Sequence, residues 1–266
     1  MMSSEQRQSY ILKIAKEKSF VSIAEVSAKL DISIETVRRD INKLCEYGLV
    51  KKVRGGAAPV KFPSRKDADY LLRIRSNQQA KLTIAVEAAD MIRDGQVVAF
   101  DCGVSIQSIA YCVSDVKNVT LVTNSIPVAT ILLDKLNSGE ISGRIIVIGG
   151  ECDTKNRFSK GGEAINEIMK YHFDIAFVSC TALSQEAVSS YSLDECSYSK
   201  QLVDRSNCSV LVAESDKIGK NSVCTFAKIT DFDKIITDDL KELSDEFKKK
   251  CEEAKVELVI ATRKSV

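Results

Sequence analysis

The segment between residues 22 and 56 constrains this chain most, because it combines two short helical patterns with a tight polar turn between them. The second pattern repeats apolar side chains at the three- and four-residue spacing of a buried helical face: Ile34, Val37, Ile41 and Leu44. Its other face carries charged and hydrogen-bonding side chains: Glu35, Thr36, Arg38, Arg39, Asn42 and Lys43. Such a helix fits a DNA major groove, where its donors reach base edges and phosphates.

The ends of these helices and the segment after them support the same interpretation. Ser22 and Glu25 have capping-box spacing, and Ser33 is a suitable N-cap for the second helix. Gly48 is placed to end that helix. Residues 49–56 predict a β-wing, and its basic side chains are placed to contact phosphates beside the groove. We therefore expect DNA contacts from Ser22, Ser33, Glu35, Thr36, Arg38, Arg39, Asn42, Lys43, Lys51, Lys52 and Arg54.

Charge divides the chain into a basic amino-terminal part and an acidic remainder. Residues 1–66 contain 14 Lys and Arg against 7 Asp and Glu, a net charge of +7, whereas the whole chain carries +1. A basic part suits a polyanionic partner. The charge by itself fits a solvated helical domain that binds protein equally well, but the helix spacing and the basic wing favour double-stranded DNA.

The length of 266 residues allows one large domain or two smaller ones, and the charge asymmetry favours two. Pro59 and Pro63 mark the boundary, so we expect a DNA-binding domain at 1–58, a linker at 59–76 and a second domain at 77–266. No apolar run reaches membrane-spanning length, and the first residues lack a secretory signal. The nine cysteines include no C-x-x-C pair, which indicates reduced thiols in the cytoplasm and no metal site.

The remainder alternates apolar runs with helical patterns. The runs at 97–100, 119–122, 145–148 and 175–178 are each followed by a segment with helical spacing. Further apolar runs lie at 210–213, 234–237 and 256–260, with a polar helix between the last two. Continuous apolar strands between helices are typical of a mostly parallel sheet covered on both faces. We therefore predict an α/β domain.

Polar residues and glycines recur directly after three of these runs. Parallel strands place such residues together at the carboxyl edge of the sheet, where ligands bind. Helix N-termini at this edge offer free amides and a positive dipole end, both suited to phosphate, and Lys217 adds a cation. One such loop alone is an ordinary turn, but three favour a site for a small anionic ligand. The expected ligand-binding residues are Asp101, Gly103, Val104, Ser105, Thr123, Asn124, Ser125, Gly149, Gly150 and Lys217.

Five of these segments together resemble the deoxyribose-operon repressor (DeoR) family: Ser33–Lys43, Arg54–Ala57, Asp101–Gly103, Val122–Ser125 and Gly149–Gly150. They follow in the family's order along essentially the whole chain. The resemblance implies a winged helix-turn-helix domain and a sensor domain with a sheet related to sugar-phosphate isomerases. It also implies a repressor of a sugar or polyol catabolism operon, released by a phosphorylated metabolite.

The chain departs from the family pattern in three places. Val104 and Ser105 stand where the family commonly has two threonines, and Asp216 stands where it usually has serine before Lys217. Glu214 replaces the usual aspartate. The segment Thr181–Ser184 replaces a glycine-rich tract often found in the family.

An enzyme is the main alternative, namely a sugar-phosphate isomerase that carries a DNA-binding domain. Isomerisation needs a positioned base, and ribose-phosphate isomerases of this fold carry an acidic tract where this chain has the acid-free residues 178–184. Asp101 and Glu214 remain candidate bases. A protein-interaction module that does not bind DNA is a third alternative. We predict a regulator without catalytic residues or cofactor, and a homo-oligomer, because paired reading heads bind symmetric half-sites.

Overall fold

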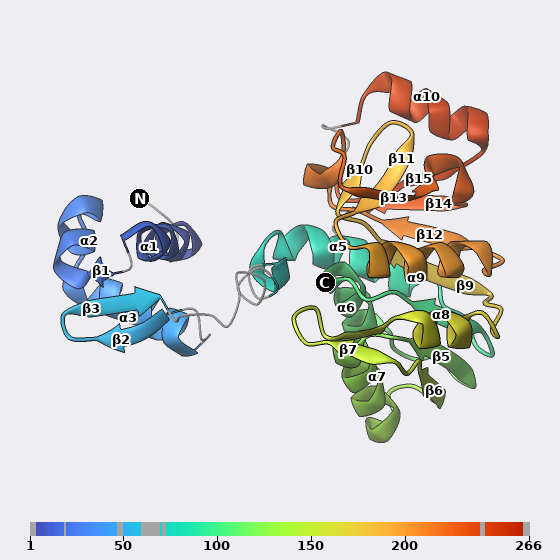
Figure 1. Cartoon of the computed structure of the whole chain (residues 1–266), viewed down its shortest axis with the longest axis horizontal. Coiled ribbons are helices and arrows are strands. Elements are labelled where there is room, and N and C mark those ends of the chain that lie inside the picture. Colours follow the sequence, from blue (N-terminus) through green and yellow to red (C-terminus); the bar gives the residue numbers. More distant parts are fainter. Residues whose placement is uncertain are drawn as a thin grey trace. The chain divides into compact units, whose positions relative to one another are not determined.

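The computed structural model describes residues 4–18, 20–46, 50–59, 70, 73–239 and 243–262. The chain divides into two compact units, an N-terminal unit of Met1–Leu71 and a C-terminal unit of Leu72–Val266 (Figure 1). Most of the predicted linker at 59–76 lies outside the described residues, and so does Gly48. Within the described residues, none of the helices combines the length and apolar character that a membrane span needs.

The N-terminal unit is a winged helix-turn-helix, as predicted. It contains α1 (Ser4–Lys18), β1 (Val21–Ser22), α2 (Ile23–Leu30), α3 (Ile34–Glu46), β2 (Val50–Val53) and β3 (Gly56–Pro59). The strands form an antiparallel sheet in the order β1-β3-β2. A Cβ at Gly56 would lie 1.9 Å from the carbonyl oxygen of Val21, so β1 pairs this closely with β3 because residue 56 is glycine.

The core of this unit confirms most of the predicted apolar face of α3. Val37, Ile41 and Leu44 are buried, together with Ile11 of α1 and Val26 of α2. Ile34 was predicted to be buried as well, and this was wrong, since 48% of it is exposed. It is the first residue of α3 and lies at the edge of the small core, and the half-buried Ile32 of the preceding turn packs against the core.

The C-terminal unit contains the predicted parallel sheet. Seven strands lie in the order β15-β14-β12-β9-β4-β5-β6, and every neighbouring pair is parallel. β4 is the first strand of this sheet along the chain, yet it lies inside the sheet. The next two strands, β5 and β6, are added on one side of β4, and the later strands are added on the other side, starting with β9. Such a switch point creates a crevice at the carboxyl ends of the strands. The strands are β4 (Val97–Phe100), β5 (Val119–Thr123), β6 (Gly143–Val147), β9 (Ile175–Ser179), β12 (Ser209–Val212), β14 (Lys234–Thr237) and β15 (Glu257–Ile260).

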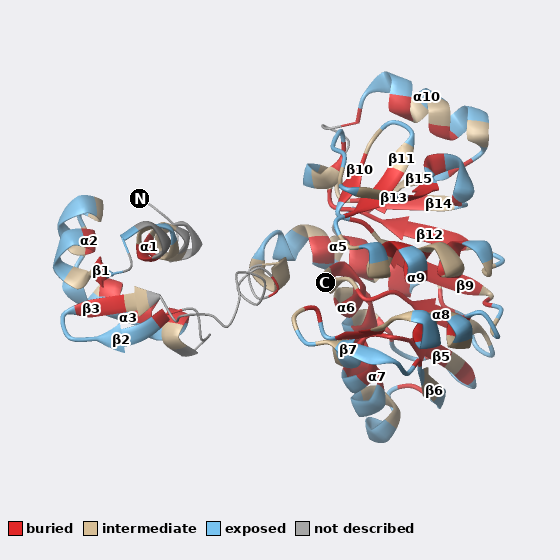
Figure 2. Cartoon of the chain, viewed as in Figure 1, coloured by how far each residue is buried: buried red, intermediate tan, exposed pale blue. Residues whose placement is uncertain are grey.

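Helices cover both faces of this sheet, and its five inner strands are almost wholly buried, whereas the edge strands β6 and β15 are partly exposed (Figure 2). One core joins the sheet to α5 (Gln78–Ala89), α6 (Val104–Cys112) and α7 (Ile126–Ser138). The core on the opposite face joins it to α8 (Gly162–Ile168), α9 (Leu193–Asp204) and α10 (Asp245–Ala254). Apolar surface on both faces explains why the strands read as continuous apolar runs.

Two small additions lie outside the seven-stranded sheet and had no sequence prediction. The hairpin of β7 (Glu151–Asp153) and β8 (Phe158–Lys160) follows β6. A second antiparallel sheet contains β10 (Ala182–Leu183), β11 (Ala187–Ser190) and β13 (Cys224–Lys228). The short helix η1 (Ser215–Lys217) follows β12, and η2 (Ile229–Asp231) precedes β14.

Candidate DNA-binding surface and effector site

The outward face of α3 presents the side chains predicted to read DNA. Arg38, Arg39, Asn42 and Lys43 are exposed. Arg38 lies 3.7 Å from Glu35, and both side chains are more than half exposed, so this pair constrains Arg38 little. The arginines of α3 therefore remain accessible to a polyanion.

The predicted serines act first as helix caps. The Oγ of Ser33 accepts a hydrogen bond of 3.1 Å from the amide of Thr36, and the two hydroxyls lie 2.8 Å apart. The Oγ of Ser22 accepts from the amide of Glu25 at 3.4 Å. These caps fix where α2 and α3 begin, so they orient the exposed face of α3.

The wing carries the remaining predicted cations. Lys51 and Lys52 lie on β2, and Arg54 follows in the turn to β3, and all three are exposed. Gly55 occupies this turn at φ 81°, a conformation that favours glycine. The turn thus places exposed positive charge at the tip of the hairpin.

Asp40 is a structurally important residue that the sequence interpretation missed. It lies on α3 but is only 2% exposed. The guanidinium of Arg7 donates to both of its carboxylate oxygens, from Nε at 2.7 Å and from Nη2 at 3.3 Å. A signal was present, because position 40 falls on the same helical face as Val37, Ile41 and Leu44. The pair joins α1 to α3 and fixes how α3 is rotated.

In the C-terminal unit, Asp101 holds neighbouring strand ends together. It follows β4, is buried, and accepts hydrogen bonds from the amides of Cys102 and Ser179 at 2.8 and 3.1 Å. It also accepts from the hydroxyl of Ser199 on α9 at 3.1 Å. Burial raises the pKa of Asp101 despite these donors. A Cβ at Gly103 would lie 2.0 Å from Ser179 Oγ, so the loop after β4 lies this close to the end of β9 because residue 103 is glycine.

The loops after β5 and β6 meet the β7–β8 hairpin. Thr123 Oγ1 accepts from the amide of Ser125 at 3.0 Å, and Ser125 Oγ caps α7. Asn124 donates to the carbonyl of Ser159 at 2.9 Å, whereas its Oδ1 is buried without a partner among the described residues. Gly149 and Gly150 are exposed, and a Cβ at Gly150 would lie 2.7 Å from the Lys160 carbonyl oxygen.

Glu214, which follows β12, gathers two of the predicted effector-binding residues. Its Oε1 accepts from Ser105 Oγ at 2.6 Å, and its Oε2 lies 2.5 Å from Lys217 Nζ. Lys81 Nζ of α5 lies 3.9 Å from Oε1. We call Ser105, Glu214, Lys217 and Lys81 the Glu214 cluster. Lys81 was missed in the sequence, although its position on the buried face of α5 marks it as unusual.

Electrostatics within the Glu214 cluster favour the charged forms of Glu214 and Lys217. Burial alone would raise the pKa of Glu214, but Lys217, Ser105 and Lys81 together lower it below its ordinary value. Burial would lower the pKa of Lys217, but its anionic neighbours, Glu214 first among them, together outweigh that effect and raise it. For Lys81, burial dominates over Glu214 and lowers the pKa.

The lowered pKa of Glu214 predicts a defined dependence of stability on pH. Its stabilising contribution is complete above the ordinary carboxyl pKa of 4.5 and is lost as the pH falls through the lower folded value. Glu214→Gln should therefore cost about 3 kcal/mol at neutral pH, because it leaves the partly buried ammonium group of Lys217 without its nearest anion, and this cost should shrink in acid. Urea unfolding as a function of pH measures both effects. Glu253→Gln, at an exposed pair with Lys249, is the control, and parallel pH curves for Glu214→Gln and the wild type would contradict the assignment.

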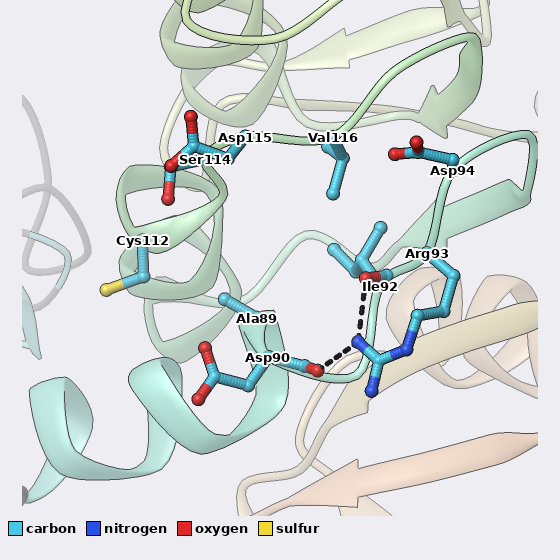
Figure 3. Close-up of a pocket in the computed structure, with 9 residues that line it drawn as sticks. All are labelled: Ala89, Asp90, Ile92, Arg93, Asp94, Cys112, Ser114, Asp115 and Val116. Atoms are coloured by element: carbon cyan, nitrogen blue, oxygen red, sulfur yellow. Dashed lines mark hydrogen bonds between the residues drawn. The ribbon is translucent and has the colours of Figure 1, made fainter.

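Two cavities lie at opposite ends of this unit. One of about 570 Å³ is bounded by the loops that precede β4 and β5, and Figure 3 shows Arg93 donating there to the carbonyl oxygens of Asp90 and Ile92. Another of about 470 Å³ is lined by Glu214 with Asn77, Thr83 and Asp238. Neither cavity is lined by a predicted effector-binding residue, but the second includes Glu214, which contacts Ser105 and Lys217. The second cavity therefore lies beside the candidate effector site at the carboxyl edge of the sheet.

Comparison with known families gives matches along both units. Residues 7–61 match the DeoR-like helix-turn-helix domain, and residues 76–239 match the DeoR C-terminal sensor domain. The chain is 30% identical over 236 residues to the uncharacterized HTH-type transcriptional regulator YgbI of Escherichia coli K12, covering 88% of this chain and 89% of that protein.

Two further similarities concern a named repressor and a solved structure. The glycerol-3-phosphate regulon repressor of Escherichia coli K12 is 26% identical over 239 residues, covering 89% of this chain and 92% of that protein. Ribose 5-phosphate isomerase A of Neisseria gonorrhoeae aligns with 52% of this chain and 52% of its own, at 11% identity and a TM-score of 0.37. The two family matches and the relative at 30% identity agree with the folds of the two units. The chain therefore belongs to the DeoR family of DNA-binding transcriptional regulators.

Proposed function

We propose that this regulator represses genes of sugar or polyol catabolism and that a phosphorylated metabolite releases it from its operator. The observation that carries the proposal is the Glu214 cluster, which brings Ser105 and Lys217 together at the carboxyl edge of the sheet. A relative whose name refers to a glycerol-3-phosphate regulon supports the same chemical class. The proposed domains are 1–58 for DNA binding, 59–76 for the linker and 77–266 for the sensor.

A phosphate group suits this edge for two physical reasons. α6 begins at Val104 without a side-chain cap, so the first amides of the helix are available to an anion. The side chain of Lys217 is 24% exposed, so this cation is not sealed within the fold. A phosphate accepting from Lys217 and from these amides would make charge-assisted hydrogen bonds.

On the DNA side, α3 would enter the major groove while the wing contacts phosphates. The exposed arginines of α3 supply the donors for base edges, and Lys51, Lys52 and Arg54 supply charge for the backbone. Two heads are needed for a symmetric operator, so we propose a homo-oligomer. Effector binding would favour an arrangement of the sensor domains in which the spacing of the DNA-binding domains no longer matches the half-sites of the operator.

Regulation is favoured over catalysis by the state of the two candidate bases. Asp101 is buried and accepts three hydrogen bonds that join strand ends. Glu214 is buried and paired with Lys217. A general base must reach a substrate proton, and both carboxylates are instead committed to holding the fold together.

Lys217→Met tests the effector site. In the wild type, a phosphorylated sugar or polyol that binds should raise the unfolding midpoint in proportion to its occupancy. The variant should bind that compound about 10-fold more weakly, because one charge-assisted hydrogen bond is lost. Thermal shift against a panel that includes sn-glycerol 3-phosphate measures this, with each protein compared to itself without ligand.

Lys220→Met is the matched control for the loss of a nearby lysine. Lys220 is exposed and donates to the carbonyl oxygen of Asp216, so it lies in the same loop but outside the Glu214 cluster. An equal ligand-induced shift in Lys217→Met and the wild type would remove Lys217 from the effector site. A panel in which no phosphorylated compound stabilises the wild type would refute the proposed effector class.

A further inference from the structure

The segment through which the chain enters the C-terminal unit is fastened to the loops at the carboxyl edge of the sheet. Arg73 Nη2 donates to Asn156 Oδ1, in the β7–β8 hairpin, at 2.6 Å, and its guanidinium lies 5.9 Å from the ring centroid of Tyr191. Asn77 Nδ2 donates to Asp216 Oδ2 at 2.8 Å. Residues 73–77, which are helical at 73–75 and turn at 76–77, are thus attached at both ends, and we call this segment the turn at 73–77.

Lys81 holds the same turn from within. Its ammonium group donates to the carbonyl oxygens of Arg73, at 2.8 Å, and of Ser76. Lys81 is only 6% exposed, and its Nζ lies 3.9 Å from Glu214 Oε1. One buried cation therefore binds the backbone of the turn and also lies beside the carboxylate of the Glu214 cluster.

These contacts form a continuous path from the candidate effector site to the turn. Ser105 and Lys217 contact Glu214, Glu214 attracts Lys81, and Lys81 binds the carbonyls of residues 73 and 76. We propose that Lys81 is a positioning residue through which effector binding loosens the turn at 73–77. This inference rests on the proposed function, since it requires an anionic effector at Lys217.

The direction of the effect follows from the charges. A phosphate that pairs with Lys217 removes a counter-ion from Glu214 and adds a like charge beside it. Lys81 then becomes the cation of the Glu214 cluster that remains for the carboxylate. Attraction toward Glu214 draws its ammonium group away from the two carbonyls, and the turn loses the hydrogen bonds that close it. Because the chain continues from this turn toward the N-terminal unit, its loosening changes the tether of the DNA-binding domain.

Amide hydrogen exchange on the full-length protein tests the proposal, with inorganic phosphate and sn-glycerol 3-phosphate as probes at constant ionic strength. In the wild type, a bound probe should speed exchange at residues 73–77 about fivefold or more, the low end of typical coupling between sites. In Lys81→Met, exchange in this turn should be fast with or without the probe. Lys81→Arg, which keeps a cation, should retain part of the response.

Lys135→Met is the matched control, because Lys135 of α7, whose side chain is only 12% exposed, also pairs with a glutamate, Glu140, in the same unit. It should leave the probe response at 73–77 unchanged. Probe binding that Lys217→Met weakens, without any change in exchange at 73–77 of the wild type, overturns the role of Lys81 and leaves the proposed effector site standing. A wild type that binds neither the two probes nor any other phosphorylated compound of the panel overturns both.

Discussion

Replacing Arg38 and Arg39 together by alanine is expected to weaken operator binding about 100-fold at moderate salt. An arginine that pairs with guanine discriminates by about 1–3 kcal/mol, and an arginine on a phosphate adds the release of a counter-ion. Both side chains are exposed on α3, and the ion pair of Arg38 with Glu35 lies at the surface, so the variant should keep its fold. Fluorescence anisotropy measures the loss on a duplex that the wild type selects from a random library.

A second double variant separates recognition from general charge. Lys13→Ala with Lys29→Ala removes the same charge from exposed positions on α1 and α2. It should weaken binding much less than the arginine variant. The slope of log K against log salt should fall by about one for each phosphate that a variant no longer neutralises. If the arginine variant binds like the wild type, or the lysine variant loses as much, α3 is not the recognition helix.

Local patterns predicted the N-terminal unit well because its signals are short-range. The three- and four-residue spacing identified Val37, Ile41 and Leu44 as core residues, and the caps at Ser22 and Ser33 follow from side chains three residues away from their partners. The error at Ile34 has the same origin. A periodic pattern shows which face of a helix is apolar but not how far along the helix the core extends.

Long-range pairing explains what the sequence did not reveal. The strands and the loops that follow them were predictable, since a parallel sheet brings its carboxyl ends to one edge. Glu214, however, bonds to Ser105, which is 109 residues away in the sequence, and Arg73 bonds to Asn156, which is 83 residues away. Partners this distant depend on the assembled topology. For the same reason nothing in the sequence indicated that the polar atoms of Ser105 and Asp101 would be used within the fold.

Asp40→Ala should destabilise the N-terminal unit by about 3–5 kcal/mol, because it leaves the largely buried guanidinium of Arg7 without its carboxylate. A unit of about 70 residues has a total stability of roughly 4–10 kcal/mol, so this loss unfolds a large fraction of it. Glu35→Ala, at an exposed position on the same helix, should change stability by less than about 0.5 kcal/mol. Urea unfolding of the full-length protein, monitored through amide exchange in α3, measures the stability of both variants. Equal stabilities for the two variants would contradict the structural role of Asp40.

Replacing both Arg7 and Asp40 by apolar residues tests whether this ion pair also orients α3. Arg7→Met with Asp40→Leu removes both charges from the interface of α1 and α3, and such replacements often restore stability. The carboxylate, however, receives two donors of one guanidinium, which fixes direction in a way that apolar contact does not. We therefore expect the double variant to regain stability but to bind its selected duplex about 10-fold more weakly, because the arginines of α3 lose their fixed rotation. Recovery of full DNA affinity together with stability would limit the pair to a role in folding.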